Sequence, residues 1–310
     1  MGIKHNHTAT GTNDGTKQVS VTRWNEDHVI VDQIDIPLIA TPVAPATDNV
    51  GVFGRKIAGR MMLAQIGPSG LDTTFQPNLG GNKVAMWMPP GNATTVPGVF
   101  GMGALTAIGT PTARNVATTN LLTRMTRMAM VSAAGAGNLA GYREPNAKYT
   151  VGAGSGLGGF FTRIRFGTGD AAAVAGARMF VGMSASTAAP TNVEPNTLLN
   201  SIGVAQLSTS NNLHIVHGGT TANAAIDLGA GFPANTLSAD AYELALFAPT
   251  AGNVFYQLSR LNTGTSVSGQ ITTNLPLSTV LLCHQMWRCN NATALAVVLD
   301  ICGIYIETDY

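Results

Sequence analysis

Charged residues are scarce in this sequence. Only 11% of its 310 residues are Asp, Glu, Lys or Arg, whereas about a quarter of a typical globular domain is charged. The formal net charge is +1, so no overall field would draw the chain to nucleic acid, and we expect no nucleic-acid partner. Such a chain depends for solubility on Ser, Thr, Asn and backbone groups, or buries much of its surface against copies of itself.

Cysteine is scarce as well. The three cysteines, Cys283, Cys289 and Cys302, are an odd number near the C-terminal end, which does not indicate a disulfide framework. A metal cluster around Cys283 and His284 is disfavoured, because neighbouring residues of a strand point to opposite faces. We interpret the cysteines as buried free thiols in a chain that assembles in a reducing cytoplasm.

Long apolar runs and coiled-coil heptads are missing. No window reaches the roughly 18 apolar residues that a membrane-spanning helix needs, and the first residues have no apolar signal core. We therefore expect neither a membrane partner nor a targeting segment.

Motifs for catalysis are also lacking. The stretch GAGSGLGG, 152–159, matches a phosphate-binding glycine pattern, but that pattern must open a helix and the strand-like FFTRIRF follows here. We interpret it as a flexible joint. The 16 acidic residues are spread singly and nominate no glycosidase pair, although a pair formed in space or between chains stays open. We predict no catalytic residue and no cofactor.

Short alternating segments separated by Gly, Pro and Asn dominate the second half of the chain. In FFTRIRF, Phe161, Arg163 and Arg165 would face one way, and Thr162 and Ile164 the other. Similar runs lie at 177–186, 213–219, 242–250, 254–264, 278–287 and 294–308. This spacing predicts an all-β sandwich or barrel. The last run is apolar on both faces, which predicts a central strand.

Composition divides the chain into three expected domains, 1–44, 45–147 and 148–310. The middle one is β-rich and has an excess of basic residues, including Arg55 and Lys56. We interpret these as solvated or interface side chains, with a patch for an anionic partner as the alternative. The segment NLLTRMTRMAMVSAA, 120–134, fits a helix or a strand, and we favour the strand.

Two pairs of histidines are candidate metal ligands. His5 and His7 would face one way on an extended chain, so three chains about a threefold axis would supply six imidazoles for a transition-metal ion. The alternative is a pair of exposed histidines near the N-terminus. His214 and His217 are three apart on a predicted strand, so they would face opposite ways and would not share a metal.

The segment KQVSVTRWNEDHVI, 17–30, resembles the T-x-W-N-x-x-H entry segment of bacteriophage tail-fibre and related virion proteins. The stretch 54–98 and the closing domain are similar to phage structural proteins too. The resemblance implies a homotrimeric fibre with an extended N-terminal arm, a trimerising middle domain and a C-terminal jelly-roll sandwich of lectin-like type. It also implies that Trp24, Asn25 and His28 dock on a neighbouring virion protein, with packing inside the chain as the alternative.

The predicted function is therefore a non-enzymatic virion fibre that recognises the host surface through a glycan. The turn QMWRCNN supplies the receptor-binding candidates, which are Trp287, Arg288, Asn290 and Asn291. Burial of Trp287 is the alternative. A capsid decoration or head-fibre protein that clamps shell subunits is the second hypothesis. A tailspike depolymerase is the third, although such enzymes usually carry a repetitive β-helix and this sequence shows no repeat.

Overall fold

The chain folds into antiparallel strands, as its alternating patterns predict. A computed structural model describes residues 35–40, 42–46, 48–66, 72–74, 83–91, 93–153, 159–290 and 295–308. Met1–Pro37 and Leu38–Tyr310 form separate units, and every strand described belongs to the second unit. The expected N-terminal arm, 1–44, lies mostly outside the described residues.

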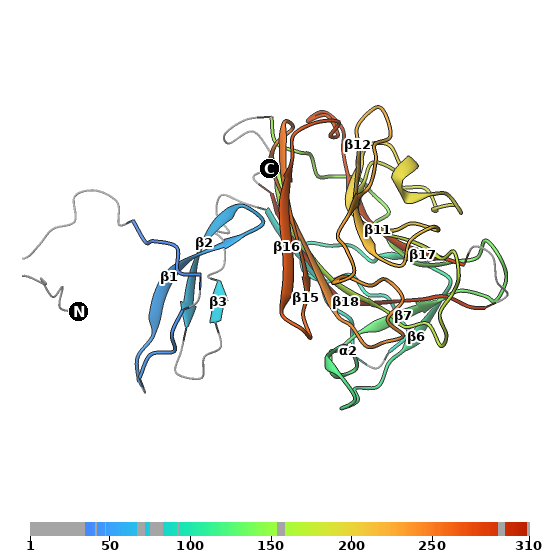
Figure 1. Ribbon diagram of the computed structural model, residues 1–310, viewed down its shortest axis with the longest axis horizontal. Coiled ribbons are helices and arrows are strands. Elements are labelled where there is room, and N and C mark those ends of the chain that lie inside the picture. The colour runs from blue at the N-terminus through green and yellow to red at the C-terminus, as the bar shows by residue number, and fades with distance from the viewer. Residues whose placement is uncertain are drawn as a thin grey trace, which may run out of the picture. The chain divides into compact units, whose positions relative to one another are not determined.

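Two large sheets pack face to face, which confirms the predicted two-sheet sandwich. The first has seven strands in the order β13-β12-β11-β10-β17-β8-β5. Its strands are β5 (Thr106–Ile108), β8 (Leu139–Arg143), β10 (Arg178–Ser184), β11 (Ser201–Gln206), β12 (Leu213–Gly218), β13 (Ile226–Asp227) and β17 (Cys283–Cys289). Figure 1 shows β12, β11 and β17 in this layer.

The second sheet has eight strands in the order β16-β15-β14-β9-β18-β7-β6, and β4 also pairs with β18. Its strands are β4 (Lys83–Trp87), β6 (Thr110–Ala113), β7 (Met128–Val131), β9 (Phe160–Thr168), β14 (Tyr242–Thr250), β15 (Asn253–Arg260), β16 (Thr265–Ile271) and β18 (Val298–Thr308). The prediction of a central strand near the C-terminal end is confirmed by β18, which lies between β9 and β7.

The core lies between the two sheets and consists of the side chains that each strand points inward, which are every second residue along it. Ile164 and Phe166 of β9, Leu244 of β14 and Met286 of β17 are all fully buried in it. Removal of this apolar surface from water is the main stabilising contribution, at about 25 cal/mol per Å². The strands are short because Gly, Pro and Asn in the connections end each ladder.

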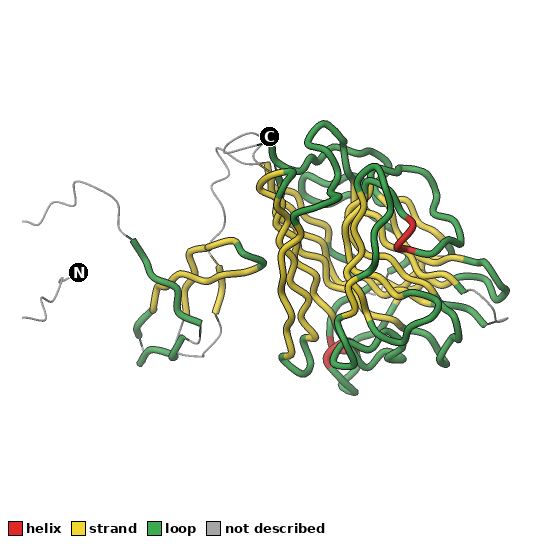
Figure 2. The backbone as a smooth tube through the Cα atoms, turned by 45° about the horizontal axis from the view of Figure 1, so that its top comes forward, coloured by secondary structure: helices red, strands yellow, loops and turns green. Residues whose placement is uncertain are grey.

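Helices contribute little. The described residues contain a four-residue helix, α2 (Leu121–Arg124), and a short 3-10 turn, η1 (Pro195–Thr197); both appear as red segments among yellow strands in Figure 2. In the described part of the chain, no helix is long and apolar enough to cross a membrane. The ambiguous segment 120–134 contains both elements, because Asn120 caps α2 and the buried Met128 and Met130 then lie on one face of β7.

The boundary expected between residues 147 and 148 falls inside the sandwich. Strand β8 pairs with β17, and both β7 and β4 pair with β18. The region 83–143 therefore supplies strands to both large sheets instead of forming a domain of its own. Beside the sandwich lies a small three-stranded sheet of β1 (Gly51–Ile57), β2 (Arg60–Ile66) and β3 (Asp72–Thr74).

Candidate functional site

The outer face of the eight-stranded sheet carries a polar tract that follows from strand register. On β9, Arg163 and Arg165 point away from the core, as the alternation of FFTRIRF predicts. Arg165 lies directly opposite Glu243 on β14, and Glu243 lies opposite Ser259 on β15. Ser259 in turn lies opposite Ser266 on β16. One row across four strands thus presents guanidinium, carboxylate and hydroxyl groups to the outside.

A hairpin covers part of the same face. The backbone N–H of Ala58, in the turn between β1 and β2, donates to Oε1 of Gln257 at 3.3 Å. The guanidinium of Arg60 lies 5.0 Å from the ring centre of Phe161 and pairs with Glu307. A cation over an aromatic face is attracted by the ring's quadrupole. The hairpin tip is therefore fixed on an aromatic patch beside the polar tract.

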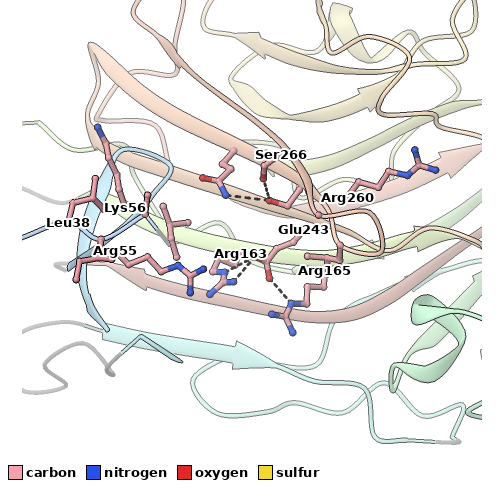
Figure 3. Close-up of a pocket in the computed structure, with 15 residues that line it drawn as sticks. Leu38, Arg55, Lys56, Arg163, Arg165, Glu243, Arg260 and Ser266 are labelled. Atoms are coloured by element: carbon pink, nitrogen blue, oxygen red, sulfur yellow. Dashed lines mark hydrogen bonds and ion pairs between the residues drawn. The ribbon is translucent and has the colours of Figure 1, made fainter. Parts of the chain in front are cut away.

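Between this hairpin and the sheet lies an open pocket of about 680 Å³. Figure 3 shows Arg55 extending from β1 towards Arg163, Arg165 and Glu243 on the sheet, while Lys56 lies at the rim with its side chain turned away from them. Its lining residues are Leu38, Ile39, Ala40, Arg55, Lys56, Ile57, Arg163, Arg165, Glu243, Gln257, Ser259, Arg260, Leu261, Gly264 and Ser266.

Glu243 is the only acid among these lining residues, and two arginines hold it. Oε1 of Glu243 accepts from Arg163 Nη2 at 2.5 Å, and Oε2 accepts from Arg165 Nε at 2.5 Å. Burial raises the pKa of Glu243, but the two guanidinium groups outweigh burial and lower its pKa overall. The carboxylate is therefore ionised and fixes both arginine side chains in place.

Arg260, on β15, is held at the edge of the pocket. Nη2 of Arg260 lies 2.9 Å from Oδ2 of the buried Asp240, and Nη1 donates to the carbonyl of Gly231 at 3.2 Å. The hydrogen bond and the charge of Asp240 raise the pKa of Arg260. Arg260 therefore keeps its positive charge near the pocket, but its Nη1 and Nη2 groups are already bonded to Gly231 and Asp240.

A second pocket, of about 370 Å³, is smaller and less polar. It is lined by Val84, Ala85, Gly101, Lys148, Tyr149, Ile306 and Thr308. Lys148 is the one charged group among the described residues of this lining, and its Nζ already lies 3.1 Å from Oε1 of the buried Glu144. The larger pocket therefore offers the stronger case for a ligand.

The structure corrects the receptor-binding candidates of QMWRCNN, most of which is strand β17 and not a turn. Trp287, Arg288 and Asn290 have 0% exposure, so a ligand in solvent does not reach them. Trp287 packs beside Phe180, with ring centres 6.4 Å apart, in a small apolar cluster on the seven-stranded sheet. This is the alternative that the sequence left open. The fourth candidate, Asn291, lies outside the described residues.

Arg288 is buried because a complete set of acceptors surrounds it. Nε donates to Asp170 at 2.8 Å, Nη1 to Gln206 at 2.6 Å, and Nη2 to both Asp170 and Asn235. Oδ1 of Asp170 also accepts from the backbone N–H of Val298 at 2.6 Å. A buried charge is tolerated when it is paired and hydrogen-bonded in this way. The role of Arg288 is to join strands.

A Thr-His-Glu arrangement crosses the interior but is closed to solvent. His284 Nδ1 lies 2.7 Å from Oε2 of Glu144, and His284 Nε2 lies 2.9 Å from Oγ1 of Thr162. The Thr162 hydroxyl donates to the carbonyl of Tyr305 at 2.8 Å, so it accepts from His284. The spacing matches that of a nucleophile, base and orienting acid, yet exposure is at most 1% for all three. The arrangement bridges the two sheets.

Among the described residues, no group of three or more His, Cys, Asp or Glu side chains is placed to hold a metal ion. The cysteines are free thiols, as predicted, with Cys283 and Cys289 buried and Cys302 partly buried. His214 contacts the carbonyl of Asn212, and His217 contacts the carbonyl of Asn274 in a different loop. His5 and His7, like the docking candidates Trp24, Asn25 and His28, lie outside the described residues.

No protein-family model matches the chain, and no curated protein matches it. Among solved structures, a protein of unknown function from Shewanella oneidensis MR-1 has 14% identity over 73% of this chain and 86% of its own, with a TM-score of 0.48. Peanut lectin with a nine-residue peptide has 9% identity over 73% of this chain and 97% of its own, with a TM-score of 0.48.

The basic pocket was missed by the sequence reasoning, although part of its signal was present. The alternation in FFTRIRF places Arg163 and Arg165 on one face. The excess of basic residues in 45–147 raised the alternative of a patch for an anionic partner, and Arg55 and Lys56 from that region do line the pocket. These basic side chains come together only because β9 pairs with β14 and because the hairpin that contains β1 packs on the outer face of the same sheet.

Proposed function

We propose that this chain is a non-enzymatic structural protein of a bacteriophage particle and that it binds a glycan of the host surface. The virion assignment is supported by the segments at 17–30 and 54–98 that resemble virion fibre proteins. In this proposal the protein assembles in the bacterial cytoplasm as a homotrimer, and its N-terminal arm, 1–44, attaches to other virion proteins. The sandwich then faces the host.

The open pocket beside β1, β9 and β15 is the observation that carries the binding role. Guanidinium groups of Arg163 and Arg165 converge there with the amide of Gln257 and the hydroxyls of Ser259 and Ser266. A few convergent polar groups in a concave site are typical of a small-molecule or saccharide site. Hydrogen-bond donors in such number suit a ligand rich in oxygen acceptors.

Binding of the purified full-length protein to host cells tests this role. We expect saturable binding to intact cells and its loss after periodate oxidation of the surface polysaccharide, because oxidation destroys the hydroxyl pattern that the pocket reads. Equal binding to oxidised and intact cells would refute a glycan receptor. Release of reducing ends from the polysaccharide during incubation would instead support a depolymerase.

Position and assembly need separate measurements. Electron micrographs of particles labelled with an antibody to this chain should show label on the particle, at the tail for a fibre or on the head for a decoration protein. Sedimentation at micromolar concentration should give a trimer, because a chain with 11% charged residues benefits from burying surface between copies. A stable single subunit would contradict the trimer.

A further inference from the structure

The charge of the pocket is strongly one-sided. Among the described residues that line it, Glu243 alone is acidic, whereas five are basic: Arg55 and Lys56 of β1, Arg163 and Arg165 of β9, and Arg260 of β15. Even with Asp240 counted against Arg260, positive groups outnumber negative ones. The chain as a whole has a net charge of only +1, so this excess is a local property of the pocket.

Donors remain available after the internal contacts are made. Arg165 uses its Nε for Glu243, and its side chain lines the pocket and is 48% exposed. Lys56, on the neighbouring hairpin, is exposed as well. Guanidinium groups bind carboxylate and sulfate in a bidentate manner, and such charge-assisted bonds are roughly twice as strong as neutral ones.

The lining also indicates which ligands fit poorly. None of the described residues that line the pocket is aromatic. A neutral sugar would find no ring to stack on, and a single-stranded nucleic acid would lack the aromatic platforms on which its bases usually stack. Gln257 Nε2 donates to Ser259, which bonds to Ser266. A hydroxyl oxygen has two lone pairs, so the two serines can also accept from sugar hydroxyls. Charge and hydroxyl recognition together describe one class of ligand.

We propose that the pocket binds an acidic saccharide, meaning a sugar unit that carries a carboxylate or a sulfate. In this complex Arg165 contacts the anionic group, Lys56 adds positive charge from the rim of the pocket, and the hydroxyls of Ser259 and Ser266 contact ring hydroxyls. The inference rests on the proposed function, because it specifies the glycan bound at the same pocket. Glu243 is the positioning residue, since it orients Arg163 and Arg165 without contacting the ligand.

Titration calorimetry on the full-length protein tests the inference with four probes. Oligogalacturonate supplies carboxylates and dextran sulfate supplies sulfates, while carboxyl-reduced oligogalacturonate and dextran are their neutral counterparts. We expect at least one acidic probe to bind about tenfold or more tightly than its neutral counterpart. Its affinity should fall as salt rises, because exposed ionic contacts are screened.

Substitutions locate the binding to the pocket. Arg165→Ala should weaken binding of the acidic probe by about tenfold, and Lys56→Ala by a smaller factor because Lys56 acts from the rim. Both side chains are exposed, and Arg163 still holds Glu243 in the Arg165 variant. Arg124→Ala is the matched control, because Arg124 is an exposed arginine on α2 and does not line the pocket. Equal thermal unfolding of all three variants would show that they keep the fold.

The outcomes separate this inference from the proposed function. Equal binding of acidic and neutral probes, or unchanged binding by Arg165→Ala, would overturn the acidic ligand and leave a glycan receptor standing. Polyphosphate or single-stranded DNA that bound more tightly than both acidic probes would also overturn it, because the site would then read charge alone. Failure to bind any probe, together with failure to bind host cells, would refute both.

Discussion

Glu144 shows how a single buried carboxylate can stabilise this sandwich. Its Oε2 accepts from the backbone N–H of His284 at 2.9 Å and contacts the imidazole at 2.7 Å, and Lys148 approaches Oε1. Burial raises the pKa of Glu144, but the contacts with His284 and Lys148 outweigh it and bring the pKa down from 4.5 to about 2. The ionised form is thus the one that the fold stabilises.

Acid should therefore lower the free energy of unfolding by protonating Glu144. A folded-state pKa below the unfolded one contributes stability above pH 4.5 and loses it as the pH falls towards 2, and a shift of this size corresponds to about 3 kcal/mol at neutral pH. Glu144→Gln should lower the free energy of unfolding at pH 7 by an amount of that order, and the difference from wild type should shrink as the pH falls through this window.

Urea unfolding at pH 7, 4 and 3 measures this difference. Asp48→Asn is a suitable control, since Asp48 is exposed and has φ 67°, a conformation that Asn tolerates. If the deficit of Glu144→Gln were the same at all three pH values, its ionisation would not be the source of the stability.

Single residues were the hardest feature to predict from the sequence. Trp287 and Arg288 follow one another in a turn-like stretch rich in polar residues, which suggested exposure. Burial of Arg288 depends on Asp170, Gln206 and Asn235, which lie 118, 82 and 53 residues away in sequence. A local sequence pattern carries no information on partners so distant in sequence. The burial of Arg288 could therefore be recognised only once the pairing of the strands was known.

At the scale of elements, the hairpin of β1 and β2 is the part that shapes the pocket. Its turn contains Gly59 with φ 76°, a left-handed conformation that glycine adopts without cost. A Cβ atom at this position would come within 2.6 Å of the ring of Phe255. The tip can therefore lie against the sheet only while residue 59 has no side chain.

Gly59→Ala should release the hairpin tip and leave the sandwich folded. The backbone penalty at a left-handed position is about 1 kcal/mol, and the clash with Phe255 adds to it. Gly91→Ala is the matched control, since Gly91 has φ 81° and a Cβ atom added there would meet nothing within 4 Å. Hydrogen exchange should be faster in β1 and β2 of the Gly59 variant alone.

The Gly59→Ala substitution should affect the ligand site as well. Because Arg55 and Lys56 approach the pocket on β1, the Gly59→Ala variant should also bind the acidic probe more weakly than Gly91→Ala does. Retention of full binding and of slow exchange in the hairpin would show that the tip tolerates a methyl group, and that its contact with Phe255 does not hold the pocket together.

The alternating patterns predicted individual strands well at this scale, because side-chain period depends only on local sequence. The runs at 160–166 and 242–250 became β9 and β14, and the last run became the central β18. The patterns could not provide register. Arg165 faces Glu243 only because β9 and β14 pair antiparallel at that alignment, and the sequence separation of 78 residues leaves many other alignments equally possible.

At the scale of the whole molecule, the amino-acid composition predicted a boundary between domains 45–147 and 148–310 that the structure does not have. The basic excess of 45–147 and the glycine-rich stretch at 152–159 suggested a joint between domains. In the structure, strands from both sides of that stretch share each sheet, since β7 and β4 pair with β18, and β8 pairs with β17. Charge content reports on surfaces and says little about which strands share a core.

A fragment made at the expected boundary should consequently fail to fold. Residues 148–310 keep β9, β17 and β18 but lose β4, β7 and β8, which would expose the apolar side chains of Met286, Leu299 and Ile304 that are buried in the intact core. Residues 38–310 keep every strand of the compact unit. We expect this longer fragment to unfold in one cooperative transition and the shorter one to aggregate or to show no transition. Calorimetry of the two fragments measures this, and a cooperative transition in 148–310 alone would mean that strands β4 to β8 are dispensable to the core.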